Sequence, residues 1–247
     1  MTTLCHDVLF DRKERLNMSL VIHTIVPEGI VVSADTRTTR KDTNGHVRYD
    51  DSAEKIIPFS KKIVVSHCGD AKVSEDLTVV QFLYNIRKLC GKESTVTSLP
   101  LKILNEYIKR GGKGDTIFKV SGYDNDLFAY TYTVSTSKST ITLSTDSNDF
   151  GASYGGITNI AHSIMNSGID YKGLSIKDAV VLTQTCVNTN ITTFKYHFEQ
   201  SIGGICKTYI IDILHDHIGW LQTDGTIVPD ENISDDVSQG SHDQHTA

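Results

Sequence analysis

Up to about residue 70, short runs of apolar and β-branched residues alternate with turn residues. This pattern predicts mostly β-strands in that part of the chain. Pro27 and Gly29 supply the backbone angles of a tight turn between the first two runs. The dipeptide Asn44-Gly45 is typical of a hairpin turn. The four strands expected in this part are residues 20–26, 30–34, 55–59 and 62–67.

In the next two stretches the apolar residues lie three and four positions apart, which is the spacing of an amphipathic helix. The first helix is expected over residues 73–90 and the second over 98–110. Pro100 suits the first turn of the second helix, and Gly111 is a typical helix stop.

The second half of the chain is expected to contain three strands, then two helices, then two more strands. Two further helices are expected near residues 157–167 and 175–199, and Ser175 with Asp178 makes a start that resembles a capping box. The remaining strands are expected at residues 116–123, 127–133, 140–145, 205–214 and 218–222.

Runs of strands and paired helices, without strict βαβ alternation, predict an α+β fold. Two antiparallel sheets packed face to face, with a helix pair on each outer side, would bury the apolar faces of all these elements. We expect one domain over residues 19–228, preceded by an extension or propeptide over 1–18 and followed by a disordered acidic tail over 229–247.

Composition restricts the function classes. The 247 residues are 38% hydrophobic and 22% charged, which suits a globular domain with its own core. The net charge of −6 gives no support to binding nucleic acid through its phosphates. No segment approaches the about 18 uninterrupted apolar residues of a membrane helix, and the first residues lack the apolar centre of a signal peptide. We therefore expect a cytoplasmic protein without nucleic-acid or membrane partners.

Three polar residues stand at the ends of strands that should be buried. Ser19 precedes the first strand, Asp35 follows the second and Lys55 begins the third. A charge at the end of a buried strand needs a partner, so Asp35 and Lys55 are natural partners. From these residues alone, a structural ion pair is favoured over a catalytic pair.

The segments MSLVIHTIVPEGIVVSADTR and SAEKIIPFSKKIVVSHCGDA resemble the β-type subunits of the proteasome and their bacterial ring-protease relatives, which are N-terminal-nucleophile (Ntn) hydrolases. Gly29, the motif Ala34-Asp35-Thr36-Arg37, Lys55 and Gly69 stand at the positions of the family pattern, and counting back without a gap puts Ser19 on the nucleophile position. The resemblance implies a four-layer αββα sandwich, hydrolysis of peptide or amide bonds in peptide or protein substrates, a homo-oligomeric ring or spiral, and room for an unfoldase partner. It requires no metal or organic cofactor.

The resemblance also implies roles for single residues. The free α-amino group of Ser19, with an ordinary pKa of about 7.7–8.0, would be the base for its own hydroxyl. Lys55, paired with Asp35, would lower the pKa of that hydroxyl, and the Gly69 N–H would face the oxyanion.

Two later residues of the chain stand near the family's supporting positions. A Ser in a Gly-Ser-Gly turn and an Asp before Ser-Gly-Gly support the amine in the family, and Ser153 and Glu199 are the residues nearest to them here. Ile202 replaces the family Ser, with Ser201 beside it. Either Glu199 and Ser201 compensate for this change, or the supporting triad is degraded.

The nucleophile position departs from the family pattern in one respect. The family nucleophile is usually Thr after a Gly at which the precursor cleaves itself, whereas Ser19 follows Met18. We hypothesise that Met18 is the true initiator, so that removal of this methionine would expose Ser19. Two alternatives stay open: a catalytically inactive structural ring subunit, like the proteasome α-type, and an Ntn amidase that acts on a small molecule.

Other motifs favour structural interpretations. His215 and His217 could share one face of a strand and offer two imidazoles to a metal, but no third ligand is evident, which favours a solvated turn. His67 and Cys68 are adjacent, so their side chains should point to opposite faces of a strand. The segment 109–114 lacks the frame of a phosphate-binding loop.

Overall fold

The computed structural model describes residues 19–41, 44, 46–90, 94–156, 159–196, 200–231 and 233. Two antiparallel sheets dominate this part of the chain. Sheet I has the order β12 (Gly151–Gly156), β1 (Leu20–Val26), β2 (Gly29–Asp35), β13 (Cys206–Asp212), β14 (His217–Leu221) and β15 (Ile227–Val228). Sheet II has the order β11 (Thr140–Asp146), β10 (Ala129–Ser135), β9 (Thr116–Tyr123), β6 (Ile63–Gly69) and β5 (Ile56–Ser60). Two small hairpins, β3 (Thr38–Lys41) with β4 (Val47–Asp50) and β7 (Lys72–Ser74) with β8 (Leu77–Thr78), lie outside these sheets.

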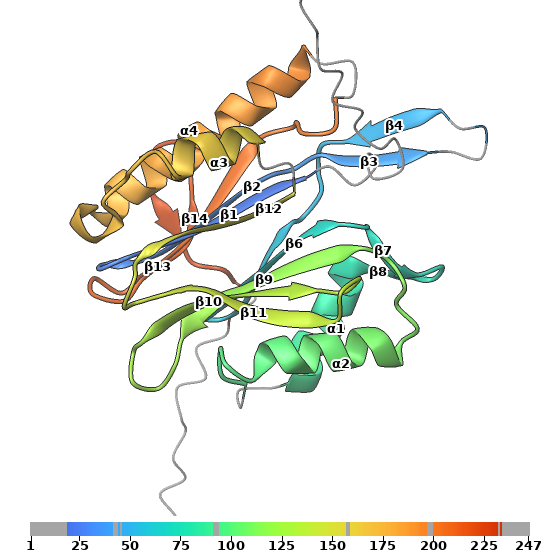
Figure 1. The fold of residues 1–247 in the computed structure, drawn as a ribbon, viewed down its shortest axis with the longest axis horizontal. Coiled ribbons are helices and arrows are strands. Elements are labelled where there is room, and N and C mark those ends of the chain that lie inside the picture. Colours follow the sequence, from blue (N-terminus) through green and yellow to red (C-terminus); the bar gives the residue numbers. More distant parts are fainter. Residues whose placement is uncertain are drawn as a thin grey trace, which may run out of the picture.

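Four α-helices accompany the sheets in the described part of the chain. The helices α1 (Val79–Cys90) and α2 (Leu99–Lys109) lie on sheet II, and α3 (Asn159–Met165) and α4 (Ile176–Lys195) lie on sheet I (Figure 1). A short 3₁₀ turn, Tyr171–Gly173, precedes α4. The expectation of two antiparallel sheets accompanied by helices is therefore confirmed.

Apolar side chains fill three interfaces of this arrangement. Between α1, α2 and sheet II, the rings of Phe82, Tyr107 and Phe118 meet with centroids 5.9–6.0 Å apart. Between the two sheets, Val21 and Val32 of sheet I belong to one cluster with Val64 of sheet II. A third cluster joins sheet I to α3 and α4. Each fully buried large apolar side chain stabilises the fold by about 1.5–3 kcal/mol.

The first predicted helix, over residues 73–90, is wrong at its start. Residues 72–78 form the small hairpin β7–β8, and α1 begins only at Val79. Thr78 caps it: its Oγ1 accepts from Gln81 N at 3.2 Å, and Gln81 Oε1 accepts from Thr78 N at 3.1 Å. This reciprocal pair is a capping box, which marks a helix start in the sequence more sharply than the apolar spacing does.

The later elements agree with the predictions except for two strands. The capping box of Ser175 and Asp178 at the start of α4 is confirmed. The strands β12 and β15 were not predicted, because β12 reads Gly-Ala-Ser-Tyr-Gly-Gly, which lacks apolar alternation, and β15 is only two residues long.

The predicted N-terminal extension and the predicted C-terminal tail lie mostly outside the described residues. Residues 1–18 lie outside them, as does the tail except for residues 229–231 and 233. Within that part, Asp230 Oδ2 accepts from Trp220 Nε1 at 3.3 Å, and Ile233 packs against the cluster between the sheets. Among the described helices, none combines the length and the apolar character needed to cross a membrane.

Candidate active site

Asp35 and Lys55 form an ion pair that joins the two sheets. Asp35 ends β2 of sheet I, Lys55 directly precedes β5 of sheet II, and Lys55 Nζ lies 2.6 Å from Asp35 Oδ1. The Lys55 side chain is 3% exposed and the Asp35 side chain is fully buried. Burial lowers the pKa of the Lys55 amine, and the Asp35 carboxylate opposes that effect.

The Asp35 carboxylate accepts four hydrogen bonds. Oδ1 accepts from Leu20 N at 2.8 Å as well as from Lys55 Nζ, and Oδ2 accepts from Arg37 N and from Gly203 N, each at 3.2 Å. A buried carboxylate is costly unless its lone pairs are satisfied, and these donors satisfy them. One side chain therefore ties the start of β1, the end of β2, the segment before β5 and the segment before β13 together.

Ser19 is linked to this carboxylate through the residue that follows it in the chain. The next residue, Leu20, donates its backbone N–H to the same Asp35 oxygen that accepts from Lys55. Ser19 itself is 8% exposed. The structure thus brings Ser19, Asp35 and Lys55 to one end of β1 and β2, although they are far apart in sequence.

Gly69 ends β6, in the sheet opposite Ser19. Its φ is +100°, and a Cβ at this position would collide with the carbonyl oxygen of Asp115. A backbone hydrogen bond connects β6 to Lys55: His67 N donates to the Lys55 carbonyl oxygen at 3.0 Å. Only glycine fits this turn without strain.

The segment before β13 closes the site from the other side. Ile202 is fully buried in the cluster that contains Leu20, and a Cβ on Gly203 would collide with the Arg37 guanidinium. Sequence reasoning did not anticipate that Gly203 would donate to Asp35; the string Ser201-Ile202-Gly203-Gly204 was the available signal. Glu199 lies outside the described residues.

Ser153 is not brought to the ion pair. In the β1–β12 register it pairs with His23, four residues along β1 from Ser19, whereas Gly156 pairs with Leu20. The Ser153 hydroxyl instead accepts from Lys119 Nζ at 2.6 Å.

Lys119 is a second buried amine between the sheets that sequence reasoning missed. It is 2% exposed and also donates to Thr133 Oγ1 at 2.9 Å. Burial lowers the pKa of its amine to about 8. The available signal was one lysine within the predicted strand of residues 116–123, but only the register shows that it points toward sheet I.

His23 forms a neutral polar centre next to Lys119. Its two ring nitrogens lie 2.6 Å from the hydroxyls of Ser66 and Ser121. Burial, aided by the nearby Lys119 charge, lowers the pKa of the His23 ring well below its ordinary value. With both nitrogens bonded to hydroxyls, His23 links the sheets and leaves no ring nitrogen for a reaction.

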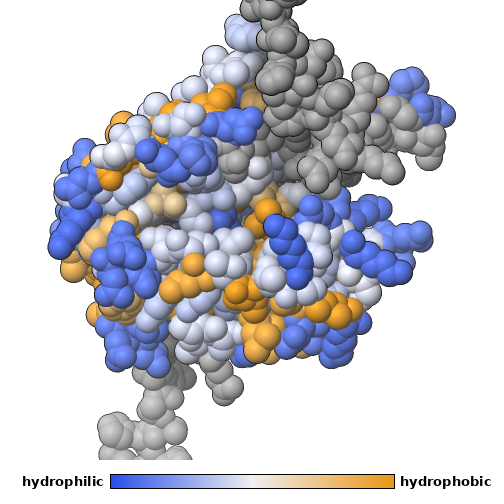
Figure 2. Space-filling model, viewed as in Figure 1, coloured by the Kyte–Doolittle hydropathy of each residue, from blue (hydrophilic) through white to orange (hydrophobic). Residues whose placement is uncertain are grey.

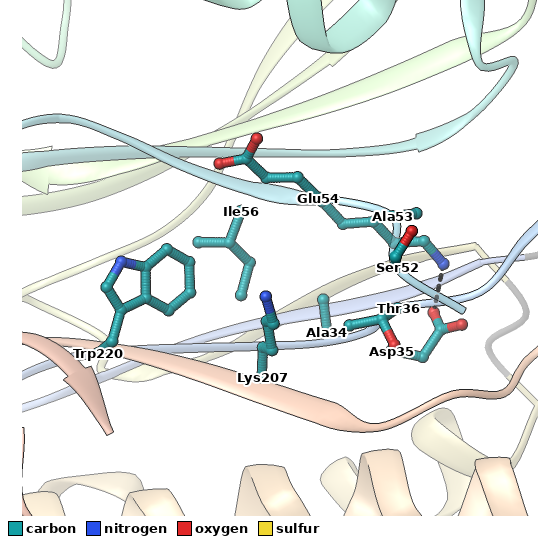
Figure 3. A pocket seen from close by; sticks show the side chains of 10 residues that line it. Ala34, Asp35, Thr36, Ser52, Ala53, Glu54, Ile56, Lys207 and Trp220 are labelled. Carbon is teal, nitrogen blue, oxygen red and sulfur yellow. Dashed lines mark hydrogen bonds and ion pairs between the residues drawn. The ribbon is translucent and has the colours of Figure 1, made fainter. Parts of the chain in front are cut away.

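A cavity of about 240 Å³ adjoins the ion pair (Figure 3). Its walls come from the end of β2 and the residue after it, the segment before β5, the start of β5, and strands β13 and β14. Neither Ser19 nor Gly69 lines it. The lining residues are Ala34, Asp35, Thr36, Ser52, Ala53, Glu54, Lys55, Ile56, Lys207 and Trp220.

The remaining motifs occupy structural positions. His215 Nδ1 lies 2.9 Å from Asp212 Oδ2, and His217 Nδ1 lies 3.9 Å from the same oxygen. Within the described part of the chain, no group of three or more metal-ligating side chains is placed to hold a metal ion. Burial raises the pKa of the Cys68 thiol to about 11, so this thiol stays protonated and unreactive near neutral pH.

Comparison with known proteins places the fold. No protein-family model matches the chain, and neither does any curated protein sequence. Among solved structures the chain is similar to Anbu (ancestral beta-subunit) from Yersinia bercovieri, with a TM-score of 0.59 and 14% sequence identity, over 77% of this chain and 80% of that chain. At this identity the likeness shows the fold alone, which is proteasome-like.

Proposed function

We propose that the chain is a proteasome-like Ntn hydrolase that cleaves peptide or amide bonds through an acyl-enzyme on Ser19. The observation that carries the proposal is the buried Asp35–Lys55 pair, whose carboxylate also holds the N–H of Leu20, the residue after Ser19. The helix pairs on the outer faces of sheets I and II support the finer description of the fold as the four-layer αββα sandwich of Ntn hydrolases.

The reaction needs Ser19 to be the first residue of the working protein. Its free α-amino group takes the proton from its own Oγ, and Oγ attacks the substrate carbonyl carbon. The Lys55 ammonium stabilises the charge developing on Oγ, and the Gly69 N–H donates to the oxyanion. The amide nitrogen leaves with the proton from the α-ammonium, and water then hydrolyses the Ser19 ester to release a carboxylic acid.

In this proposal, the segment around Ser201 positions the α-amino group of Ser19. Glu199, two residues before Ser201, is the proposed partner of the α-amino group. Ser153 has no assigned part in the reaction, because its hydroxyl is bonded to Lys119.

Assembly into a homo-oligomeric ring or spiral, a peptide or protein substrate, an unfoldase partner and a cytoplasmic location belong to the same proposal. The outer helices offer apolar contacts for assembly: Leu89, Leu101 and Ile108 are 66%, 55% and 53% exposed. On the face shown in Figure 2, hydrophobic groups gather in patches that are surrounded by hydrophilic ones. Such patches are candidate contacts for partner subunits.

A catalytically inactive ring subunit is the second candidate, and one observation favours it. The residue that pairs with Leu20 at the end of β12 is Gly156, which has no hydroxyl to support the Ser19 amine. A small-molecule amidase would use the same Ser19 chemistry on a different substrate.

Hydrolysis by protein with a defined first residue tests the proposal. The chain is produced with a removable tag so that Ser19 becomes the first residue, and it is assayed on a panel of fluorogenic peptide amides. We expect turnover that is lost in Ser19→Ala and in Lys55→Met and kept in Ser153→Ala. Absence of turnover by a folded, assembled protein that begins at Ser19 would favour the inactive subunit.

A further inference from the structure

The cavity beside the ion pair has one apolar side. Ile56 and Ala34 line it together with the ring of Trp220, whose own position is fixed by an edge contact with Tyr209 at 5.1 Å. Trp220 is the only tryptophan of the chain. This side of the cavity suits the apolar or aromatic body of a small molecule.

Lys207 is the basic residue of the cavity lining that lies outside the ion pair. Asp35 and Lys55 neutralise each other, and the Glu54 carboxylate accepts from Tyr84 Oη at 2.7 Å. Figure 3 shows the Lys207 amine pointing from β13 into the space bounded by Trp220, Ile56 and Ala34. Among the described residues, the Lys207 amine has no hydrogen-bond or ion-pair partner.

We propose that this cavity binds a small organic carboxylate, with the anion on Lys207 and the apolar body between Ile56 and Trp220. A hydroxyl of the wall can add to the recognition: Thr36 Oγ1 accepts from Ile205 N at 3.0 Å, so its proton is available to a ligand. At about 240 Å³ the cavity is smaller than the about 300–1,000 Å³ of drug-sized sites, so it takes a short acid or one end of a longer chain.

The position of the cavity links it to the ion pair. Its occupant would touch Asp35 and Lys55 from a side that neither Ser19 nor Gly69 lines. The carboxylate could belong to a free organic acid or to the C-terminus of a peptide, because both present the same chemistry to Lys207.

The fluorescence of Trp220 tests the proposal without any catalysis. The full chain is titrated with 3-phenylpropionate and, separately, with N-acetylglycyl-phenylalanine, and each is compared with its uncharged amide. We expect a saturable change in emission with an acid and about tenfold weaker binding of its amide. A response to the free acid alone, to the peptide acid alone or to both supports the site and identifies the source of the carboxylate.

Matched variants decide between this site and a nonspecific effect. Lys207→Met keeps most of the apolar stem but removes the charge, and it should weaken binding about tenfold or more. Lys138→Met removes another exposed lysine, outside the cavity, and should leave binding unchanged. Equal binding of acid and amide, no saturable response at millimolar acid, or unchanged binding in a folded Lys207→Met protein would overturn the proposal. Binding without hydrolysis would refute only the enzyme proposal, and hydrolysis without binding would refute only this one.

Discussion

The Lys55 amine crosses from the edge of sheet II to the Asp35 carboxylate at the end of sheet I, with 2.6 Å between Nζ and Oδ1. Because both side chains are almost completely buried, each charge depends on the other. The pair therefore has a consequence for stability that can be measured.

Asp35→Asn should destabilise the protein strongly. The change leaves the Lys55 ammonium buried without an opposite charge, and breaking a buried pair on one side costs about 3–5 kcal/mol. The free energy of unfolding from urea denaturation measures the loss. The double variant Asp35→Asn/Lys55→Met removes both charges and should recover part of it; a double variant less stable than the single one would argue against this account.

Gly69→Ala should destabilise the protein more than Gly111→Ala. Both glycines have positive φ, +100° and +73°, but a Cβ at position 69 meets the Asp115 carbonyl, whereas nothing lies within 4 Å of one at position 111. The backbone conformation costs about 1–2 kcal/mol in each variant, and the collision adds to it only at position 69. Thermal unfolding of the two variants compares them directly, and equal losses would mean that the turn adjusts freely.

Acid should destabilise the fold through His67. Burial lowers the pKa of its ring from 6.5 to about 4, so between these values the unfolded chain binds a proton that the folded protein does not. Stability is therefore lost as the pH falls from about 6.5 toward 4, by up to about 3 kcal/mol.

The variant His67→Gln isolates this contribution. The difference in unfolding free energy between wild type and His67→Gln should shrink over the acid range, because only the wild type loses the contribution of this ring. His162→Gln, at an exposed position, serves as the control. A difference that does not change with pH would show that His67 is not the titrating group.

Alkaline pH should stabilise the fold through Lys119. Burial lowers the pKa of its amine from 10.5 to about 8, so between these values the folded protein holds one proton fewer than the unfolded chain. Stability should therefore rise with pH across that window, by on the order of 3 kcal/mol. In Lys119→Met this rise should disappear, while Lys138→Met should keep it; an unchanged pH profile in Lys119→Met would contradict the assignment.

The sequence identified the ion pair because its two charges interrupt apolar runs at strand ends, where burial forces a partner on each of them. The two charges are matched to each other because Asp35 and Lys55 are close in sequence and because Asp35 stands in the motif Asp35-Thr36-Arg37. The same reasoning could not place Ser153, because the glycine-rich strand β12 carries no apolar alternation from which a register follows.

Lys119 shows a second limit of sequence reasoning. Its neighbours Phe118 and Val120 are fully buried toward α1 and α2, so alternation alone assigns Lys119 to the other face, where a solvated side chain would be expected. That face is covered by sheet I, and the sheet-on-sheet packing that buries it arises from contacts remote in sequence. The predicted start of α1 is too early for a local reason: the apolar spacing continues back to Val73, whereas the cap at Thr78 sets the start of the helix.

Ser19, as the first residue beside Asp35 and Lys55, is the proposed nucleophile. Intact mass and peptide mapping after treatment with a β-lactone test it most directly, on protein that begins at Ser19 and on protein that keeps residues 1–18. We predict one adduct, on Ser19, only in the protein that begins there, and none in Ser19→Ala. No adduct on folded protein that begins at Ser19, or the same labelling with residues 1–18 attached, would exclude Ser19 as an N-terminal nucleophile.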